Sequence, residues 1–455
     1  MNAVLVIGAG RTGQACAEVL AARGQRVYVT DEELPKNLRG PISAIEHAGA
    51  EFIPPENVRA MLPKIERAIL SPGVPLSGAL AQDVAACLPL VSEIEIAYEL
   101  CAAPIIAITG TKGKSTTTAL VAHILRCAGK SVRVGGNIGN PLIREARDAT
   151  PGDLVVAEVS SFQLETIQKF KPKVSVLLNV SGDHLDRYPS LDAYARAKYR
   201  IFENQDARDI FIGNLDDALV SAAAGSINAQ QFWFSTKEGT NASAFAREDV
   251  IWHRRDTSAP PRRVLERSDI SLPGTHNLEN VLAAVLVAFS VGVDAKTLAE
   301  SIPAFEPMEH RLETVAEIDG VRYVDDSKAT NPAAVVAALQ AYDSPLVLIA
   351  GGKSKGSDFS ELGEAIEARV KRLILIGESA EDIKRASGGT RATHASTIEH
   401  AVEIARRSAT AGDVVLLSPA CASFDMFRSA EERGERFAAA VRELERSAMR
   451  ETAGA

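Results

Sequence analysis

A glycine-rich loop with a lysine stands in the segment ITGTKGKSTTTALVAHIL, at the end of the short apolar run PIIAI. Backbone N–H groups from Gly110 to Gly113 can surround phosphate oxygens, and Lys114 can neutralise charge on β- and γ-phosphates. The hydroxyl of Ser115 or Thr116 can coordinate Mg2+. These residue types in this order predict a site for a nucleoside triphosphate.

The loop departs from the strict G-x-x-x-x-G-K-[ST] pattern, because Ile108 stands five positions before Gly113. What remains is a shorter loop that includes Thr111 and Lys112. A surface turn with a chance lysine is the alternative interpretation. The helix-like run that follows argues against it.

Two residues beyond the loop, Glu158 and His184, are candidates for the same site, whereas a third, Lys198, is not one from the sequence alone. Glu158 lies at the end of the strand-like run DLVVAEV, a suitable place for a Mg2+ ligand. His184, in NVSGDHLDRY, follows another strand-like run, although a lone histidine is commonly a packing or surface residue. Lys198 lies in the helix-like run SLDAYARAKYRIFEN, where the sequence alone predicts a solvated charge.

A second glycine loop opens the chain. Gly8, Gly10 and Gly13 fit G-x-G-x-x-G between a strand and a helix, and Asp31 ends the next strand at about the spacing of a ribose-binding acid. The pattern is typical of a nicotinamide or flavin dinucleotide site, but any nucleoside diphosphate can bind glycines at a helix N-terminus. Glycines that serve only tight strand–helix packing are the alternative.

The elements that must position these residues alternate between strand-like and helix-like runs, which predicts an α/β fold with parallel sheets. At 455 residues the chain is expected to form about three domains. Polar residues follow the strands' carboxyl ends, where open α/β sheets bind ligands. The polar stretch 230–272 is expected to form short strands and loops. We expect a Rossmann-like N-terminal domain over 1–93, a central P-loop ATPase-type domain over 94–307 and a Rossmann-like C-terminal domain over 308–455.

Composition excludes some classes of function. The net charge of −9 without a dense block of Lys and Arg argues against a nucleic-acid partner. No apolar run approaches the roughly 20 residues that span a bilayer, and no basic leader precedes the first one, so a cytosolic protein is expected. Cys421 is a minor candidate nucleophile. Reduced, buried thiols are expected at the five cysteines, which are Cys16, Cys87, Cys101, Cys127 and Cys421.

Nine motifs in order along the chain resemble the Mur ligase family, and the match covers essentially the whole sequence. The motifs are TGTKGKSTTT, EVSSFQLE, NVSGDHLDRY, AKYRIFEN, LPGTHNLEN, HRLE, DDSKATNP, GGKSKGSDF and LSPACASFDMF. The resemblance implies that the first domain binds the UDP of a sugar substrate in place of a dinucleotide, so no hydride carrier is required. The matching UDP-site residues are Thr12, Asp31, Ser71 and Gly73.

The resemblance also changes the expectation for Lys198, because the family carries at the matching lysine a carbamate that helps to hold a second Mg2+. It implies that ATP is bound by Gly110, Thr111, Lys112, Gly113, Lys114, Ser115, Thr116, Asn277, Asn280, Arg311 and Asp326. It implies metal ligands at Ser115, Glu158, His184 and Lys198. The implied catalytic residues are Lys114, Asn137, His184, Lys198 and Arg311, with Asn137 at the substrate or the transferring phosphate.

Selection of the amino acid is assigned by the resemblance to the third domain. Two lysines there suit a dianionic amino acid such as glutamate. The matching residues are Lys328, Thr330, Lys355, Ser423 and Phe424. Some relatives place an aromatic ring where this chain has Ala430, Lys112 replaces an asparagine often seen in the loop, and Lys353 adds a charge.

The implied reaction starts with ATP-dependent phosphorylation of the free carboxylate of UDP-muramoyl-alanine. The amino group of glutamate then attacks the acyl phosphate, while the third domain closes at hinges near 305–312 and excludes water. A monomer is expected, and the general base is left unassigned. Two alternatives stay open: a related ligase with another amino acid, Mur step or folate substrate, and a dinucleotide-dependent oxidoreductase.

Overall fold

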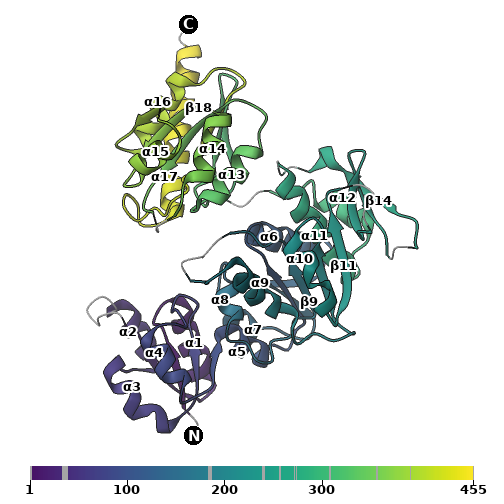
Figure 1. Cartoon of the computed structure of the whole chain (residues 1–455), viewed down its shortest axis with the longest axis vertical. Coiled ribbons are helices and arrows are strands. Elements are labelled where there is room, and N and C mark those ends of the chain that lie inside the picture. The colour runs from purple at the N-terminus through teal and green to yellow at the C-terminus, as the bar shows by residue number, and fades with distance from the viewer. Residues whose placement is uncertain are drawn as a thin grey trace. The chain divides into compact units, whose positions relative to one another are not determined.

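A computed structural model of the chain describes residues 3–32, 39–182, 187–237, 241–255, 258–270, 272, 274–306, 309–354, 357–389 and 391–453. The chain divides into two compact units (Figure 1). The first consists of Met1–Ile270 and Glu279–Phe305, and the second of Ser271–Leu278 and Glu306–Ala455. The break at Phe305 lies within the span where the sequence places a hinge.

The first unit begins with a five-stranded parallel sheet in the order β3-β2-β1-β4-β5. The strand order reverses between β1 and its neighbour β4, which makes the carboxyl ends of these two strands the expected ligand site. The strands are β1 (Ala3–Ile7), β2 (Arg26–Thr30), β3 (Glu51–Phe52), β4 (Ile65–Leu70) and β5 (Leu90–Ser92). The helices are α1 (Arg11–Ala22), α2 (Arg39–His47), α3 (Pro55–Met61), α4 (Ala79–Ala85) and α5 (Glu93–Leu100), and η2 (Leu62–Lys64) is a short 3-10 turn.

A nine-stranded sheet follows, in the order β14-β13-β12-β11-β10-β9-β6-β8-β7. Its strands are β6 (Ile105–Thr109), β7 (Ser131–Gly136), β8 (Asp153–Glu158), β9 (Val174–Leu177), β10 (Ile210–Asn214), β11 (Gln230–Ser235), β12 (Ala244–Arg247), β13 (Val250–His253) and β14 (Arg262–Glu266). The strands from β7 to β12 pair in parallel, and β12, β13 and β14 form an antiparallel meander. The predicted short strands in 230–272 are therefore confirmed.

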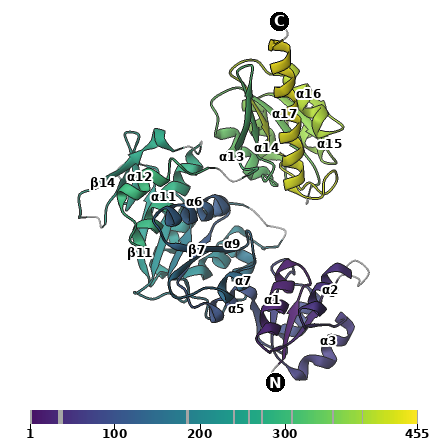
Figure 2. The same cartoon turned by 180° about the vertical axis from the view of Figure 1, so that it is seen from behind.

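Helices cover the parallel part of this sheet, so β6 and β9 are buried along their whole length and read as apolar runs. The helices are α6 (Lys114–Cys127), α7 (Leu142–Arg147), α8 (Ser161–Leu164), α9 (Leu191–Tyr199), α10 (Ala218–Ala222), α11 (Thr275–Ser290) and α12 (Ala295–Ser301). Short 3-10 turns stand at η3 (Arg200–Phe202), η4 (Ala223–Ser226) and η5 (Arg267–Asp269). Figure 2 shows α6, α7 and α9 around the teal sheet.

The second unit contains a six-stranded sheet in the order β15-β16-β20-β17-β18-β19, parallel except for the pair β15–β16. Its strands are β15 (Glu313–Ile318), β16 (Val321–Asp325), β17 (Leu346–Gly351), β18 (Val370–Ile376), β19 (Ala392–His394) and β20 (Val414–Leu417). Its helices are α13 (Pro332–Gln340), α14 (Ser360–Arg369), α15 (Ala380–Ala386), α16 (Ile398–Ser408) and α17 (Ala430–Ala453). Two apolar cores, one on each face of the sheet, hold these helices.

The expected burial of the cysteines is wrong for two of them. Cys16 and Cys421 are buried, Cys101 is half-buried, and Cys87 and Cys127 are exposed. Both exposed thiols stand near the carboxyl end of a helical run, where the apolar pattern gives way to the surface. Burial raises the pKa of the Cys421 thiol, which disfavours the thiolate that a nucleophile needs.

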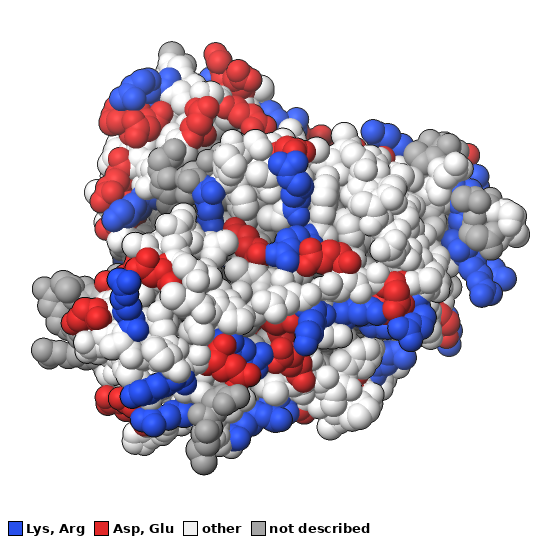
Figure 3. Space-filling model, turned by 60° about the horizontal axis from the view of Figure 1, so that its bottom comes forward, with Lys and Arg blue, Asp and Glu red and all other residues white. Residues whose placement is uncertain are grey.

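The surface charge and the lengths of the helices can be described directly. Acidic and basic side chains are interspersed on the face seen in Figure 3. Within the described parts of the chain, every helix is too short or too polar to cross a lipid bilayer.

One apolar core joins the first sheet to the central sheet within the first unit, because residues of α1, α5 and α7 belong to the same buried cluster. Polar contacts reinforce this junction. Glu18 of α1 pairs with Arg144 at 2.7 Å and with Arg147 at 3.0 Å on α7. The carboxylate of Glu93, at the start of α5, accepts a hydrogen bond from the Ile143 backbone N–H at 2.6 Å.

Glu93 should make the stability of this junction depend on pH. Its side chain is fully buried, and burial raises its pKa from 4.5 to about 7 against the opposing effect of hydrogen bonds from Ile143 and Leu142. The folded chain therefore holds a proton that the unfolded chain releases near pH 4.5. The contribution of Glu93 to the free energy of unfolding should be largest below that pH and should fall by about 3 kcal/mol as the pH rises to 7.

The variant Glu93→Gln tests this, since an amide resembles the neutral acid at every pH. We expect it to be more stable than the wild type at pH 8 and similar at pH 4.5, measured by urea unfolding of the full chain. Other titrating groups change both proteins equally, so the difference isolates Glu93. An equal pH dependence in the two proteins would contradict the prediction.

Candidate active site

The first glycine loop follows β1 and is built by close backbone packing. Gly8 has a φ of +104°, and a Cβ on Gly13 would lie 1.8 Å from the Gly8 carbonyl oxygen. Both glycines are therefore required by the strand–helix turn itself. A Cβ on Gly10 would meet nothing within 4 Å, so this glycine is the one that packing does not explain.

The residues predicted for a UDP site lie around this loop. Asp31, directly after β2, accepts a hydrogen bond from the Ala9 backbone N–H at 2.6 Å. Ser71, directly after β4, is buried, and its hydroxyl donates to the Gly8 carbonyl at 3.3 Å. Thr12 lies in the first turn of α1, and Gly73 is open to added atoms. Asp31 thus supports the loop backbone in this structure.

The second glycine loop connects β6 to α6. Gly113 adopts a φ of +80°, and a Cβ there would lie 2.2 Å from the Asn280 side-chain oxygen, so only glycine fits. The backbone N–H groups of Thr111 and Lys112 both donate to the side-chain oxygen of Asn179, at 3.0 and 2.8 Å. These two N–H groups hold the loop's shape, which leaves the positive N-terminal end of α6 to attract an anion.

Two lysine ammonium groups converge on one carbonyl oxygen of this loop. Lys114 donates to the carbonyls of Gly110 at 2.9 Å and Thr111 at 2.8 Å. Lys198, on α9, is only 1% exposed, donates to the same Gly110 oxygen at 2.8 Å and lies 4.5 Å from the centre of the Tyr194 ring. The expectation of a solvated Lys198 from sequence alone is wrong. Two like charges at one point favour an anion between them.

An acidic residue ends the neighbouring strand. Glu158 pairs in register with Ile108 of β6 and is 2% exposed. Its Oε1 accepts from the Asn137 side-chain amide at 2.7 Å, while its Oε2 has no hydrogen-bond partner among the described residues. Gly136 makes this approach possible, because a Cβ there would lie 2.2 Å from the Glu158 carbonyl oxygen. A buried carboxylate oxygen that accepts no hydrogen bond is suited to bind a cation.

The other residues predicted for the central domain have mixed placements. Ser115 is buried and Thr116 half-buried in the first turn of α6. Asn277 and Asn280 are buried on α11, and Asn280 accepts a hydrogen bond from Thr117 at 3.1 Å. Asn280 therefore supports the second glycine loop, which we also call the phosphate loop. His184 lies outside the described residues.

In the second unit the predicted residues follow the carboxyl ends of β16 and β20. Asp326 is buried, accepts from the Ser418 hydroxyl at 2.7 Å, and burial raises its pKa to about 7 although nearby Arg311 opposes the shift. Lys328 forms an ion pair with Glu431, and Thr330 lies two residues further on. Ser423 is buried, whereas Phe424 is 66% exposed. Lys355 lies outside the described residues.

Arg311 is preceded by a hydrogen-bonded histidine. His310 Nδ1 lies 2.7 Å from Asp325 Oδ2, and this contact raises the pKa of His310. The backbone N–H of His310 donates to Glu313 at 2.7 Å. The ligand atoms of these three residues lie within 4.8 Å of one another, but their own hydrogen bonds account for the cluster.

Sequence reasoning missed Arg433, the largest fully buried side chain of the described chain. It lies on α17 and donates to Ser327 Oγ and to the Ser327 carbonyl, both at 2.9 Å, and to the Cys421 carbonyl at 3.2 Å. Burial lowers its pKa to about 10. The segment SAEERGERF reads as a solvated helix, so no pattern distinguishes this arginine. Asn179 was also missed, although as the first polar residue after a buried strand it could have been found.

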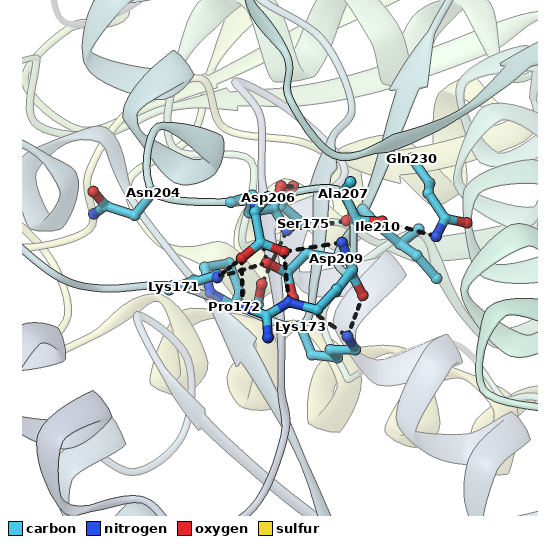
Figure 4. A network of polar contacts seen from close by, with 12 residues as sticks. Lys171, Pro172, Lys173, Ser175, Asn204, Asp206, Ala207, Asp209, Ile210 and Gln230 are labelled. Atoms are coloured by element: carbon cyan, nitrogen blue, oxygen red, sulfur yellow. Dashed lines mark hydrogen bonds and ion pairs between the residues drawn. The ribbon is translucent and has the colours of Figure 1, made fainter.

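A dense polar network lies at the amino ends of two inner strands of the central sheet. Lys171 pairs with Asp206 at 2.6 Å and with Asp209 at 3.2 Å, just before β9 and β10 begin (Figure 4). Ser175 donates to Gln205 at 2.7 Å, and Gln205 donates to the Pro172 carbonyl at 2.9 Å. These bonds fix the loop that enters β10, and strand amino ends are not where such sheets bind ligands.

The three mostly parallel, helix-covered sheets define a multidomain α/β protein, and its strand–glycine loop–helix unit with two lysines is suited to an anion. Family models agree: that of the Mur ligase middle domain matches residues 108–288, and that of the Mur ligase, glutamate ligase domain matches residues 310–421. The chain belongs to the Mur ligase family, as the nine motifs predict.

Relatives of known name extend over the whole chain. It is 43% identical over 448 residues to UDP-N-acetylmuramoylalanine–D-glutamate ligase of Pelotomaculum thermopropionicum, across 97% of this chain and 98% of that one. It is 44% identical to the enzyme of the same name from Trichlorobacter lovleyi, across 96% and 98%. The fold matches UDP-N-acetylmuramate-alanine ligase from Thermotoga maritima with a TM-score of 0.60 at 20% identity, across 98% and 100%. The predicted three-domain α/β fold is thereby confirmed.

Proposed function

We propose that this chain is an ATP-dependent ligase that joins D-glutamate to UDP-N-acetylmuramoyl-L-alanine in the synthesis of peptidoglycan precursors. The observation that carries the proposal is the convergence of Lys114 and Lys198 on the Gly110 carbonyl, at the start of a helix and beside a buried acid. A polyphosphate supplies the negative charge that this centre needs. The names of the full-length relatives supply the sugar substrate and the amino acid.

Glu158 and Ser115 fit a Mg2+ ion. A carboxylate oxygen and a hydroxyl are the hard ligands that Mg2+ prefers, and the Oε2 atom of Glu158 lacks a hydrogen-bond partner among the described residues. The ion would neutralise charge on the phosphates during transfer. The second proposed ion would add His184 and a carbamate on Lys198.

The proposed carbamate on Lys198 depends on a bound metal ion for its stability. The unmodified Lys198 ammonium satisfies a carbonyl oxygen and a ring face, both of which favour a cation. A carbamate exchanges that charge for anionic oxygens, so we propose that it persists only beside bound Mg2+. Labelling with carbon-13 bicarbonate tests this, because a carbamate resonance should be seen in the wild type with Mg2+, should disappear when Mg2+ is removed, and should be missing from Lys198→Arg.

The chain's own residues orient the reacting groups. In the proposed reaction Lys114 and Arg311 stabilise charge on the γ-phosphoryl group as it moves to the substrate carboxylate, and Asn137 holds Glu158 in place. Asn277, Asn280 and Asp326 contribute to the nucleotide site. The amino group of D-glutamate attacks the acyl phosphate and releases phosphate.

The second unit is proposed to bind the amino acid. The residues are Lys328, Thr330, Lys355, Ser423 and Phe424, and the high exposure of Phe424 leaves its ring available for contact. Non-glycine residues with positive φ, His310 at 62° and Leu312 at 48°, lie in the proposed hinge near 305–312. We keep 1–93, 94–307 and 308–455 as the proposed domains.

Release of phosphate from ATP tests the function. With UDP-N-acetylmuramoyl-L-alanine and a panel of D- and L-amino acids, D-glutamate should give the highest kcat/KM. With the substrate carboxylate labelled by oxygen-18, one labelled oxygen should appear in the released phosphate. Turnover with another amino acid alone, or phosphate without label, would reject the proposal.

A further inference from the structure

We propose that Arg11 and Arg187 are positioning residues that set the span between the sugar-nucleotide end of the site and its phosphoryl-transfer end. The inference rests on the proposed function and adds to it two residues with no assigned role. Each arginine donates a hydrogen bond from one domain of the first unit to a backbone carbonyl of the other.

The first bridge starts in the first glycine loop. Arg11 occupies one of the two positions that the G-x-G-x-x-G pattern leaves unspecified between Gly10 and Gly13, and its Nη2 donates to the Gly139 carbonyl at 2.6 Å. Gly139 lies two residues after Asn137, whose side-chain amide donates to Glu158 at 2.7 Å. A short path of hydrogen bonds and backbone therefore leads from the UDP loop to the proposed metal ligand.

The second bridge runs in the opposite direction. Arg187 of the central domain donates through Nη1 to the Pro72 carbonyl at 3.4 Å, and Pro72 stands between Ser71 and Gly73 of the proposed UDP site. Its Nη2 bonds Glu165 at 2.6 Å, and its guanidinium lies 3.8 Å from the centre of the Phe162 ring.

The base of this second bridge is rigid. The Arg187 side chain is 16% exposed and that of Glu165 only 12%. The Tyr188 hydroxyl donates to the other oxygen of Glu165 at 2.5 Å, and the Tyr188 ring packs 5.1 Å from that of Tyr194. Tyr194 in turn lies under the Lys198 ammonium. The path from Pro72 thus ends at Lys198, which donates to the Gly110 carbonyl of the second glycine loop.

The proposed substrate explains why such bridges matter. Its UDP group binds one domain, its carboxylate must meet ATP on the other, and the covalent length between them is fixed. Reacting atoms need to approach within about 3–3.5 Å, and a displacement of about 1 Å can cost about 100-fold in rate. The shared apolar core and the Glu18 ion pairs dock the two domains without the arginines. The two arginines can therefore set the distance between the UDP site and the phosphoryl-transfer site without being needed to hold the two domains together.

The test compares Arg11→Met, Arg187→Met and the double variant with the wild-type chain. The proposed UDP residues all lie in the first domain, so the Kd of UDP alone, measured by calorimetry, should change by less than about 2-fold. The kcat for ADP formation with UDP-N-acetylmuramoyl-L-alanine and D-glutamate should fall at least about 10-fold in each single variant and further in the double variant. A purely structural role would instead lower UDP affinity and thermal stability together.

Glu18→Gln is the matched control, because it removes ion pairs of the same junction away from the loops, and its kcat should stay within about 2-fold of wild type. Arg187→Lys is a second variant: one ammonium cannot serve both Pro72 and Glu165, so it should lose rate as Arg187→Met does. Arg11 is exposed, so its replacement by Met should not disturb folding. The inference is overturned if Arg11→Met or Arg187→Lys keeps the wild-type kcat. It is also overturned if the affinity for UDP falls in parallel with kcat. A wild type that forms no ADP with these substrates would instead refute the proposed function.

Discussion

Replacing Glu158 by Gln is expected to reduce ATP-dependent phosphate release by about 100- to 1,000-fold. The amide keeps an oxygen that can accept the hydrogen bond from Asn137, so the strand end should retain its shape. What disappears is the negative charge offered to Mg2+, and charge stabilisation by a metal contributes several kcal/mol to such a transfer, about tenfold for each 1.4 kcal/mol. Phosphate release measured over a range of Mg2+ concentrations should show the loss, with half-saturation shifted to higher Mg2+.

Asp153→Asn provides the comparison, because Asp153 begins the same strand and accepts hydrogen bonds from Ser131 and Thr150 at its far end. That variant should lose stability and keep its dependence on Mg2+. A Glu158→Gln enzyme with wild-type activity and wild-type Mg2+ dependence would remove Glu158 from the metal site.

The parallel sheets were predictable because the buried strands are apolar runs followed by polar residues at their carboxyl ends. Glu158 was found by this rule. Asn137, which directly follows the partly exposed strand β7, was indicated only by the resemblance to the family. Helices gave weaker signals. Lys198 has the sequence context of a solvated residue, yet α9 turns it under the phosphate loop, and only the resemblance to the family indicated a role.

Glycine patterns carried less information about ligands than they suggest. Gly8 and Gly13 are fixed by backbone contacts within the turn, which any protein with this strand–helix geometry would need. Such a pattern cannot tell UDP from a dinucleotide, because both present a diphosphate to the same helix end. Side chains that support the loops, such as Asn179 after β9, follow strands distant in the sequence from the loop. Their hydrogen bonds to the loop can be assigned only once the order of strands in the sheet is known.

Arg433→Met is expected to destabilise the second unit by about 3 kcal/mol or more and to raise the KM for D-glutamate about 10-fold. Three acceptors, on Ser327 and Cys421, would lose their donor inside the protein, and each unsatisfied group costs about 1–3 kcal/mol. Ser327 precedes Lys328, and Cys421 lies two residues before Ser423. Arg433 therefore ties together the two loops that carry the proposed glutamate ligands, and its loss should loosen both.

The control lies one helical turn further along α17. Arg436 pairs with Glu399 at 2.7 Å, but both side chains are nearly half exposed, so Arg436→Met should cost less than about 1 kcal/mol and leave the KM unchanged. Urea unfolding and initial rates over a range of D-glutamate concentrations separate the two effects. The conservative variant Arg433→Lys should recover little of the lost stability or of the KM. A single ammonium group cannot replace the planar guanidinium group, which donates to three oxygens. Equal stability losses at positions 433 and 436 would show that the buried arginine does not hold the loops, and the altered KM would then need another cause.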